Sequence, residues 1–254
     1  MARVIAVCNQ KGGVGKTTTA INTAAYLAAL GKYVLLVDLD SQANATLGLG
    51  LGHEDNEDAN VYHVLVNDQN PQSVLKRTQL FGFDVLPAAQ NLAGATVELV
   101  SMDARESRLK RAIDSVRHNY DYVLIDCPPS LGLLTINALA AAEKVMIPVQ
   151  CEYFALEGLG QLLRTVELVR NGLNQDLQVL GVVLTMYDKR NQLSNQVVNE
   201  VMKHFPGRVF SSVIPRTVSL AEAPSFGKTI LQFDPYSKAA YAYRQLAEEI
   251  IKLA

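Results

Sequence analysis

Short runs of apolar residues recur along the chain and alternate with longer segments of helical periodicity. The apolar runs predict strands at residues 3–9, 34–38, 122–126, 144–148 and 179–185. Helical patterns lie at residues 105–118, 131–142, 156–173, 191–204 and 236–253, and an earlier one ends at Gly31. Because the apolar runs are continuous rather than alternating, we expect helices on both faces of the sheet. The pattern predicts a doubly wound α/β fold with a mostly parallel sheet.

The region between residues 53 and 86 does not follow this alternation. Residues 53–58 are mostly acidic and residues 61–86 show no sustained period, so we interpret them as a less regular surface excursion. The chain has 254 residues, 49% of them hydrophobic, without an internal repeat or a Pro/Ser-rich linker. These features predict one domain spanning residues 1–254, with a core that needs no disulfide or structural metal.

Composition excludes several classes of protein. A net charge of −2 excludes a uniformly basic nucleic-acid coat but leaves room for a local basic patch. Three cysteines without a CxxC pair argue against a disulfide framework, a zinc ribbon or a four-cysteine cluster, and the four histidines lack metal-ligand spacing. The sequence shows no secretory leader and no apolar run near the ~20 residues of a membrane span. We therefore expect the protein in the cytoplasm.

A glycine-rich segment joins the first predicted strand to the first predicted helix. It is QKGGVGKT at residues 10–17, which ends like the P-loop pattern GxxxxGK[ST] but has Gln10 in place of the first glycine. The glycines let backbone N–H groups turn toward phosphate oxygens, and the helix N-terminus adds positive potential. Lys16 would then reach the β- and γ-phosphates, and the Thr17 hydroxyl would face Mg²⁺. The alternative is an ordinary glycine turn, in which a second lysine, Lys11, has no assigned role.

Three aspartates stand at predicted strand ends. Asp126 closes the run VLID, the position of a Walker B carboxylate that supports the Mg²⁺ shell through water. Asp38 and Asp40 follow the second strand, and parallel strands gather their carboxyl ends at one edge of a sheet. Each aspartate alone suits a loop cap as well as a ligand. All three at the edge that carries the glycine loop favour the ligand interpretation.

Four segments together resemble the ParA/Soj family of chromosome and plasmid partition ATPases, of the deviant Walker A class. They are KGGVGKTT at 11–18, VDLDSQ at 37–42, IDCPPS at 125–130 and IPRTVSLAEAP at 214–224. The resemblance spans almost the whole chain, and the short segment before the glycine loop resembles the chromosomal type without a helix-turn-helix extension. It implies a P-loop NTPase fold and an ATPase that uses ATP and Mg²⁺ and forms a sandwich homodimer in the ATP state.

The resemblance also implies partners. The ATP-bound dimer would bind double-stranded DNA nonspecifically and associate with the nucleoid, and a ParB-like centromere-binding protein would stimulate hydrolysis to drive DNA segregation. No arginine is placed by the sequence as a finger in cis, which predicts slow intrinsic hydrolysis. Residues 185–188 (TMYD) lie where P-loop GTPases carry [NT]KxD, and the missing lysine favours ATP.

Individual roles follow from the same resemblance. Lys11 corresponds to the signature lysine that reaches the partner's nucleotide, and Gly12 to a position of close subunit packing. Asp40 corresponds to the residue that positions the attacking water, although Ser41 replaces a proline common in relatives. The implied catalytic residues are Lys11, Lys16, Asp40 and Asp126, with Thr17 and Asp126 at the metal. The implied nucleotide contacts are Lys11, Gly12, Gly13, Val14, Gly15, Lys16, Thr17, Thr18, Met186 and Pro215, the last two with ordinary apolar filling as an alternative.

Charge is segregated toward the C-terminal part of the chain. Residues 186–228 contain six basic and three acidic residues, although the whole chain is net negative. Arg190 and Arg216 resemble the family's DNA contacts in position. A dimer would double such a patch, as suits salt-sensitive, sequence-independent binding. The alternative is an ordinary solvated face, and we interpret the basic segment 105–117 first as an exposed helix.

Two other functions remain open. A MinD-like membrane ATPase would share the nucleotide site, but its anchor needs a basic amphipathic helix, whereas residues 243–254 (YRQLAEEIIKLA) carry paired acids. We therefore expect a last helix docked on the core and no membrane partner. A reductase-type or amide-forming metabolic ATPase is the other alternative. Cys127 would lie near the γ-phosphate, but no second cysteine is evidently placed for a cluster that bridges two subunits.

Overall fold

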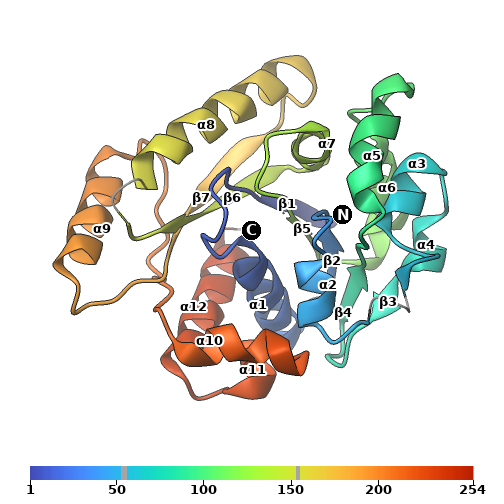
Figure 1. The fold of residues 1–254 in the computed structure, drawn as a ribbon. Coiled ribbons are helices and arrows are strands. Elements are labelled where there is room, and N and C mark those ends of the chain that lie inside the picture. Colours follow the sequence, from blue (N-terminus) through green and yellow to red (C-terminus); the bar gives the residue numbers. More distant parts are fainter. Residues whose placement is uncertain (53–55, 153–154, 254) are drawn as a thin grey trace.

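Seven strands form one sheet in the order β3-β4-β2-β5-β1-β6-β7 (Figure 1). The computed structural model describes residues 1–52, 56–152 and 155–253. The strands are β1 (Arg3–Val7), β2 (Val34–Asp38), β3 (Lys76–Arg77), β4 (Phe83–Leu86), β5 (Tyr122–Asp126), β6 (Lys144–Gln150) and β7 (Gln178–Thr185). All neighbouring pairs are parallel except β3 with β4 at one edge, which confirms the mostly parallel sheet. The strand order reverses at β1, because β2 lies to one side of it, beyond β5, and β6 lies on the other side. Open α/β sheets bind ligands at the carboxyl end of the strand where the order reverses.

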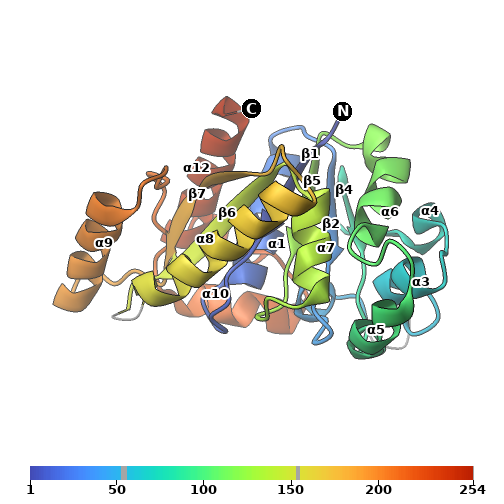
Figure 2. The same ribbon diagram turned by 90° about the horizontal axis from the view of Figure 1, so that it is seen from above.

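Helices cover both faces of this sheet (Figure 2). One face is covered by α1 (Lys16–Ala29) and α12 (Lys238–Lys252). The other face is covered by α6 (Arg108–Val116), α7 (Leu133–Ala141) and α8 (Ala155–Gly172). The remaining helices are α2 (Asn44–Gly48), α3 (Val61–Val66), α4 (Pro71–Val74), α5 (Leu92–Glu98), α9 (Gln192–His204), α10 (Val218–Glu222) and α11 (Ile230–Phe233). Three short 3-10 segments are η2 (Leu99–Ser101), η3 (Arg117–Asn119) and η4 (Ala223–Phe226).

Each strand divides its side chains between two cores. In β1, Val4 and Ala6 enter the core beneath α7 and α8. Ile5 and Val7 enter the core beneath α1 and α12. Successive side chains of a strand point to opposite faces, so a strand covered on both sides needs apolar residues at every position. This requirement explains the continuous apolar runs of the sequence.

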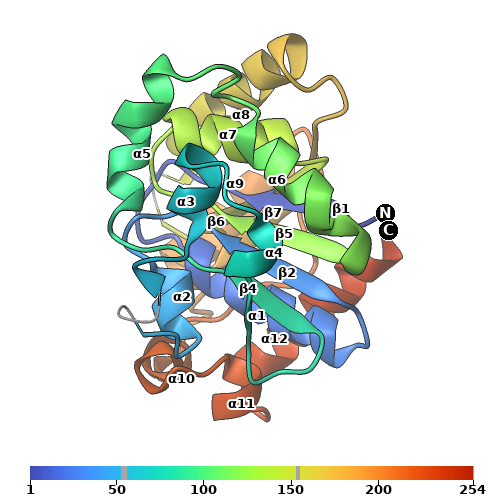
Figure 3. The same cartoon turned by 90° about the vertical axis from the view of Figure 1, so that its right-hand side faces the viewer.

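The segment 61–86 is part of the fold rather than a surface excursion, so that expectation was wrong. It contains α3, α4 and β4, and β4 pairs in parallel with β2 along its whole length. Figure 3 shows this edge of the sheet with α3 and α4 beside it. The sequence pattern did not reveal β4, because the strand has only four residues and Asp84 interrupts its apolar run. The Asp84 carboxylate accepts a hydrogen bond from the Tyr120 hydroxyl at 2.9 Å.

The other predicted elements are present, with boundaries that differ by a few residues. The helix predicted over 105–118 begins at Arg108 and continues into η3. Residues 53–55 of the acidic stretch lie outside the described residues. Within the ranges that the structure covers, every helix is too short or too polar to cross a membrane.

The buried position of β4 can be tested with two phenylalanines. Phe83 is fully buried in the core beneath α1, so Phe83→Ala should lower the free energy of unfolding by about 3–5 kcal/mol through the cavity it leaves. Phe81 is 88% exposed, and Phe81→Ala should change that free energy by less than about 1 kcal/mol. Urea denaturation measures both values. Equal effects of the two substitutions would contradict the position of β4 inside the sheet.

Candidate nucleotide-binding site

The glycine loop connects the end of β1 to the start of α1. Gly13 and Gly15 have φ angles of +73° and +84°, in the left-handed region that side chains rarely adopt, so glycine is required at both positions. Gly15 directly precedes α1, and its carbonyl oxygen accepts the Thr19 N–H at 2.9 Å. The first turn of α1 therefore presents N–H groups without intrahelical partners to the loop, as phosphate binding requires.

Two side chains outside the glycines hold the loop against the sheet. Thr185 Oγ1, at the end of β7, donates to the Val14 carbonyl oxygen at 2.8 Å. Asn9 Nδ2 donates to the Pro148 carbonyl oxygen at 2.7 Å, and Asn9 Oδ1 accepts the Lys11 N–H at 3.0 Å. These bonds tie the loop to β6 and β7. Sequence reasoning missed both residues, because their position at strand ends is the only signal that marks them.

Lys16 is the first residue of α1 and is only 7% exposed. Its Nζ donates to the carbonyl oxygen of Lys11 at 3.2 Å. Burial lowers the pKa of Lys16, and the negative charges of Asp126 and Asp40 oppose this shift. An ammonium group withdrawn from water interacts strongly with an anion, because the solvent screens it less. Lys16 is therefore suited to bind phosphate oxygens.

Asp126 ends β5 and is fully buried. Neither carboxylate oxygen has a hydrogen-bond partner among the residues that the structure describes. Burial raises the pKa of Asp126 well above its ordinary value, and the charge of Asp38 on the neighbouring strand adds to the rise. The Thr17 hydroxyl, which lies near the carboxylate without reaching hydrogen-bond geometry, and the charge of Lys16 oppose the rise. A buried carboxylate without a partner is costly unless a cation or a proton satisfies it. With the Thr17 hydroxyl nearby, these oxygen atoms fit a Mg²⁺ ion held through water.

Asp38 and Asp40 differ in environment although they are two residues apart. The buried Asp38 carboxylate accepts hydrogen bonds from Thr46 N at 2.8 Å, Thr46 Oγ1 at 2.7 Å and Asp40 N at 3.2 Å. Burial raises the pKa of Asp38 to about 6, although these hydrogen bonds oppose the rise. Asp38 thus caps the loop after β2, and its interpretation as a ligand was wrong. Asp40 is half-buried and its Oδ1 accepts the Gln42 N–H at 3.0 Å.

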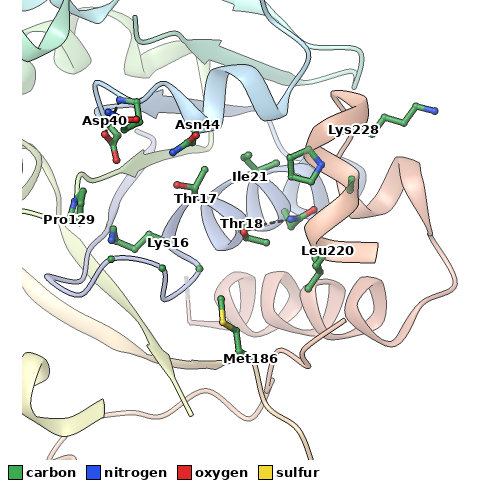
Figure 4. Close-up of a pocket in the computed structure, with 17 residues that line it drawn as sticks. Lys16, Thr17, Thr18, Ile21, Asp40, Asn44, Pro129, Met186, Leu220 and Lys228 are labelled. Atoms are coloured by element: carbon green, nitrogen blue, oxygen red, sulfur yellow. Dashed lines mark hydrogen bonds between the residues drawn. The ribbon is translucent and has the colours of Figure 1, made fainter. Parts of the chain in front are cut away.

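A cavity of about 490 Å³ lies in front of the glycine loop (Figure 4). Lys16, Asp40 and Pro129 lie toward one side of it and Leu220 toward the other. A second cavity of about 270 Å³ adjoins the first, since both are lined by the same four residues, Gly15, Thr18, Met186 and Leu220. The combined space has one end with an ammonium and a carboxylate and another end with apolar walls. A nucleoside phosphate needs both kinds of surface.

The structure brings most of the predicted nucleotide contacts to these cavities. The first cavity is lined by Gly12, Gly13, Gly15, Lys16, Thr17, Thr18 and Met186. Pro215 lines the second cavity. Val14 is buried and lines neither cavity. Lys11 lines neither cavity, and its Nζ lies 3.4 Å from Glu152 Oε2 in a half-exposed ion pair.

Arg190 and Arg216 meet at a third cavity of about 500 Å³, which Lys189 and Lys238 also line. The Arg216 N–H donates to the Tyr187 carbonyl oxygen at 3.0 Å, which places the segment after residue 214 beside the end of β7. Arg190 forms two side-chain bonds to Asp188, of 3.1 and 2.9 Å, and holds the pKa of Asp188 low, at about 2. The Arg190 side chain is still 85% exposed. Four cations and one carboxylate give this surface a positive charge.

The basic segment 105–117 is only partly an exposed helix. Lys110 and Arg111 are exposed as expected. Arg108 is only 7% exposed, and its Nε donates to the Leu65 carbonyl oxygen. The exposed interpretation was therefore wrong for Arg108, whose guanidinium joins α6 to α3.

Cys127 has a cysteine neighbour that the sequence did not reveal. The Cys8 thiol donates to Cys127 Sγ at a distance of 2.8 Å. Both thiols are free and buried, and burial together with Cys8 raises the pKa of Cys127 well above its ordinary value. A cluster shared between subunits needs thiols at the surface. The pair therefore does not suit such a cluster.

The unpartnered state of Asp126 predicts an unusual effect on stability. Its raised pKa means that the folded state keeps a proton that the unfolded state releases above about pH 4, so wild-type stability falls as pH rises from there toward the raised pKa. In the absence of nucleotide and Mg²⁺, Asp126→Asn should therefore raise the free energy of unfolding at about pH 8 and flatten its fall with pH. Urea denaturation at several pH values measures both effects.

Asp38 supplies the matched control for this measurement. Asp38→Asn should destabilise the protein by about 1–3 kcal/mol, because the amide that replaces one oxygen cannot accept the existing hydrogen bonds. An Asp126→Asn variant that is less stable than the wild type at about pH 8 would contradict the absence of a hydrogen-bond partner for the Asp126 carboxylate.

Comparison with known proteins places this site in a family. The sequence matches the family model described as an AAA domain over residues 2–179. The sporulation initiation inhibitor protein Soj of Bacillus subtilis is 56% identical, over 98% of this chain and 98% of Soj. The chromosome partitioning protein ParA of Myxococcus xanthus is 52% identical, over 99% of this chain and 89% of that protein.

The fold also matches a solved structure. A crystal structure of cobyrinic acid a,c-diamide synthase from Mycobacterium smegmatis, with bound ADP and magnesium, superposes with a TM-score of 0.88 at 42% identity and covers 99% of this chain and 95% of the other. Soj and ParA have higher identity to this chain, and the matches cover 98% of Soj and 89% of ParA. Together with the glycine loop and its strand-end aspartates, these matches show that the chain belongs to the ParA/Soj family of chromosome partitioning proteins, with the fold of P-loop NTPases.

Proposed function

We propose that this protein is an ATP-driven switch for DNA partitioning. Binding of ATP and Mg²⁺ joins two copies, the dimer binds double-stranded DNA without sequence preference, and slow hydrolysis stimulated by a ParB-like centromere-binding partner returns it to monomers. The switch acts in the cytoplasm and associates with the nucleoid while ATP is bound. The observation that carries the proposal is the buried, unpartnered Asp126 behind a glycine loop that presents Lys16, in a chain related over its full length to Soj and ParA.

Thr17 and Asp126 are the residues that would hold Mg²⁺, which neutralises charge on the β- and γ-phosphates when bound. The free oxygens of Asp126 would accept hydrogen bonds from water bound to the metal. No cluster of three or more His, Cys, Asp or Glu in the described part of the chain could chelate a metal directly. Water and phosphate oxygens therefore complete the coordination, as is usual for Mg²⁺. When a nucleotide binds, the Lys16 ammonium would leave the Lys11 carbonyl oxygen and donate to phosphate oxygens instead.

In this proposal, Asp40 orients the attacking water. It lines the main cavity, and its N–H is bonded to Asp38, which is itself anchored on Thr46. A carboxylate on an anchored backbone can accept a hydrogen bond from water in a constant position. Among the described residues, the wall of the larger cavity, where Lys16 and Asp40 lie, contains lysines but no arginine, and of these two adjoining cavities Arg216 lines only the smaller one. This composition suits slow hydrolysis until a partner supplies a further cation.

The glycine loop also carries the proposed dimer contact. Gly12 is exposed, and a Cβ built there meets no atom within 4 Å. The ion pair of Lys11 with Glu152 is half-exposed, and such pairs contribute little to stability. Lys11 can therefore exchange Glu152 for the phosphates of a partner's nucleotide.

Gly12→Val tests whether dimer formation can be lost while folding and nucleotide binding are kept. The isolated chain has room for the side chain, so the variant should fold and bind an ATP analogue with about wild-type affinity, whereas two such loops can no longer approach closely. Sedimentation velocity with ATP should show a dimer for the wild type and a monomer for Gly12→Val. Gly172→Val is the control, because Gly172 is also exposed with open space around it but ends α8. An ATP-dependent dimer of Gly12→Val would overturn the sandwich arrangement.

Arg190→Glu tests the DNA surface. Reversing this charge replaces attraction with repulsion at both copies in a dimer, so ATP-dependent DNA binding should fall by at least about tenfold, equally on unrelated duplexes. ATP turnover without DNA should remain close to that of the wild type. Co-sedimentation with DNA over a range of salt concentrations measures the effect. Arg111→Glu is the control, since it makes the same charge change on α6, at the other end of the sheet from α9 (Figure 1).

The outcome for each variant is distinct. If Arg190→Glu binds DNA as well as the wild type across the salt series, Arg190 is an ordinary surface charge and not a DNA contact. An equal loss in Arg111→Glu would mean that net charge, rather than this cavity, governs the binding.

The same experiment with liposomes tests the membrane alternative. The apolar side of α12 is already occupied, because Tyr243, Leu246 and Ile250 are buried in the core shared with α1. A helix whose apolar residues are packed inside the protein has no such surface to insert into a bilayer. We therefore expect ATP-dependent binding to DNA and none to anionic liposomes. Binding to liposomes alone would favour a MinD-like function.

A further inference from the structure

Cys8 and Cys127 occupy matching positions on neighbouring strands. β1 and β5 are parallel and in register along their whole length, and each cysteine is the first residue after the last pair. Cα atoms opposite each other on adjacent strands are about 4.8 Å apart, within the ~4.4–6.8 Å that a disulfide spans. Both side chains also enter the same core, beneath α7. The strand pairing therefore gives the two residues a Cα separation that a disulfide can span.

The two sulfurs are already in contact, at 2.8 Å. Both backbones are held in place, since the Cys8 N–H donates to the Met146 carbonyl oxygen at 3.1 Å and the Cys127 N–H to the Val7 carbonyl oxygen at 3.3 Å. Each cysteine is only 1% exposed. The third cysteine, Cys151, is also buried but has no thiol partner among the described residues. The chain thus contains one preformed pair and one separate thiol.

This pair lies at the base of the proposed nucleotide site. Cys8 directly precedes Asn9, whose side chain bonds both to the Lys11 N–H and to β6. Cys127 directly follows Asp126, the buried carboxylate. A covalent bond between the two sulfurs would therefore couple the start of the glycine loop to the proposed metal-supporting residue.

We propose that Cys8 and Cys127 form a redox modification site, at which an oxidant of the peroxide class closes a disulfide and switches nucleotide binding off. One cysteine, as its thiolate, attacks hydrogen peroxide, so that an S–O bond forms and the O–O bond breaks. The proton lost by the thiol goes to the departing hydroxide, and a sulfenic acid and one water result. The second thiol attacks that sulfur, so that the S–S bond forms, the S–O bond breaks and a second water leaves. In total the two thiols lose two protons and two electrons, and a dithiol reductant reverses the step by exchange.

Burial determines which oxidants can react. Hydrogen peroxide is similar in size to water, which suits a site of this burial, whereas a bulky disulfide such as oxidised glutathione cannot reach thiols that are 1% exposed. Closing the bond draws the sulfurs from 2.8 Å to about 2.05 Å and imposes the dihedral angle of a disulfide on the residues beside the loop and Asp126. Phosphate binding tolerates shifts of only about 0.5 Å in its contact groups. The inference rests on the proposed nucleotide site for its consequence, but not for the disulfide itself.

A Cys151→Ser variant leaves the pair as the only thiols of the protein and provides the test. After treatment with hydrogen peroxide and its removal, intact mass should show the loss of two hydrogens. Titration with a fluorescent ATP analogue should show affinity weakened by roughly tenfold or more, and dithiothreitol should restore both mass and affinity. Oxidised glutathione should change neither. The matched control adds Cys8→Ala and Cys127→Ala, and its affinity should not respond to peroxide.

Each result bears on the inference separately from the proposed function. An unchanged mass after peroxide would overturn the modification site, and a disulfide with unchanged affinity would overturn the switch. Weakening in the control without the pair would assign the effect to another oxidised group, such as Met186, and would also overturn the switch. A fully reduced protein that binds no nucleotide would instead contradict the proposed function, while the mass measurement would still test the disulfide.

Discussion

Charge withdrawn from water at the carboxyl edge of the sheet is the constraint on which the rest of the site depends. Lys16 and Asp126 are both buried, and no described residue donates a hydrogen bond to Asp126. These groups are buried because helices cover both faces of the sheet and keep solvent away from the strand ends. Groups with strongly shifted pKa values at such positions are characteristic of functional sites. A ligand that brings both phosphate and a divalent cation relieves both charges together.

The remaining polar residues at this edge serve to hold the charged groups in position. Asp38 uses its oxygens to anchor Thr46 and the backbone of Asp40. Thr185 and Asn9 attach the glycine loop to the neighbouring strands. Each of these bonds joins a loop to a rigid strand or helix, which limits the loop's freedom before a ligand binds. The same edge therefore contains two kinds of polar residue. Some have all their hydrogen bonds and hold the loops in position, and others lack partners and are free to bind a ligand.

The nucleotide cavities and the basic cavity share part of their walls. Pro215, Arg216 and Thr217 line both the smaller nucleotide cavity and the basic cavity. Met186 lines the nucleotide cavities and is followed directly by Tyr187, which lines the basic one. A nucleotide that presses on these segments would move the cations proposed to contact DNA. Physical continuity of this kind is the simplest route by which ATP binding could control DNA binding.

The sequence by itself determined the alternation of strands and helices, the glycine loop with Lys16, the strand-end position of Asp126 and the family resemblance. These features are local, because apolar periodicity and a phosphate-binding loop each depend on residues that are close together in the sequence.

The tertiary structure alone decided which segments became neighbours. It placed β4 inside the sheet, turned Asp38 into a cap, joined Arg190 to the segment of Arg216, and set Cys8 beside Cys127. The two cysteines are 119 residues apart in the chain, and their contact follows from the pairing of β1 with β5. Periodicity shows that a strand exists but carries no information about its partner, so contacts of this kind arise only when the whole sheet is assembled.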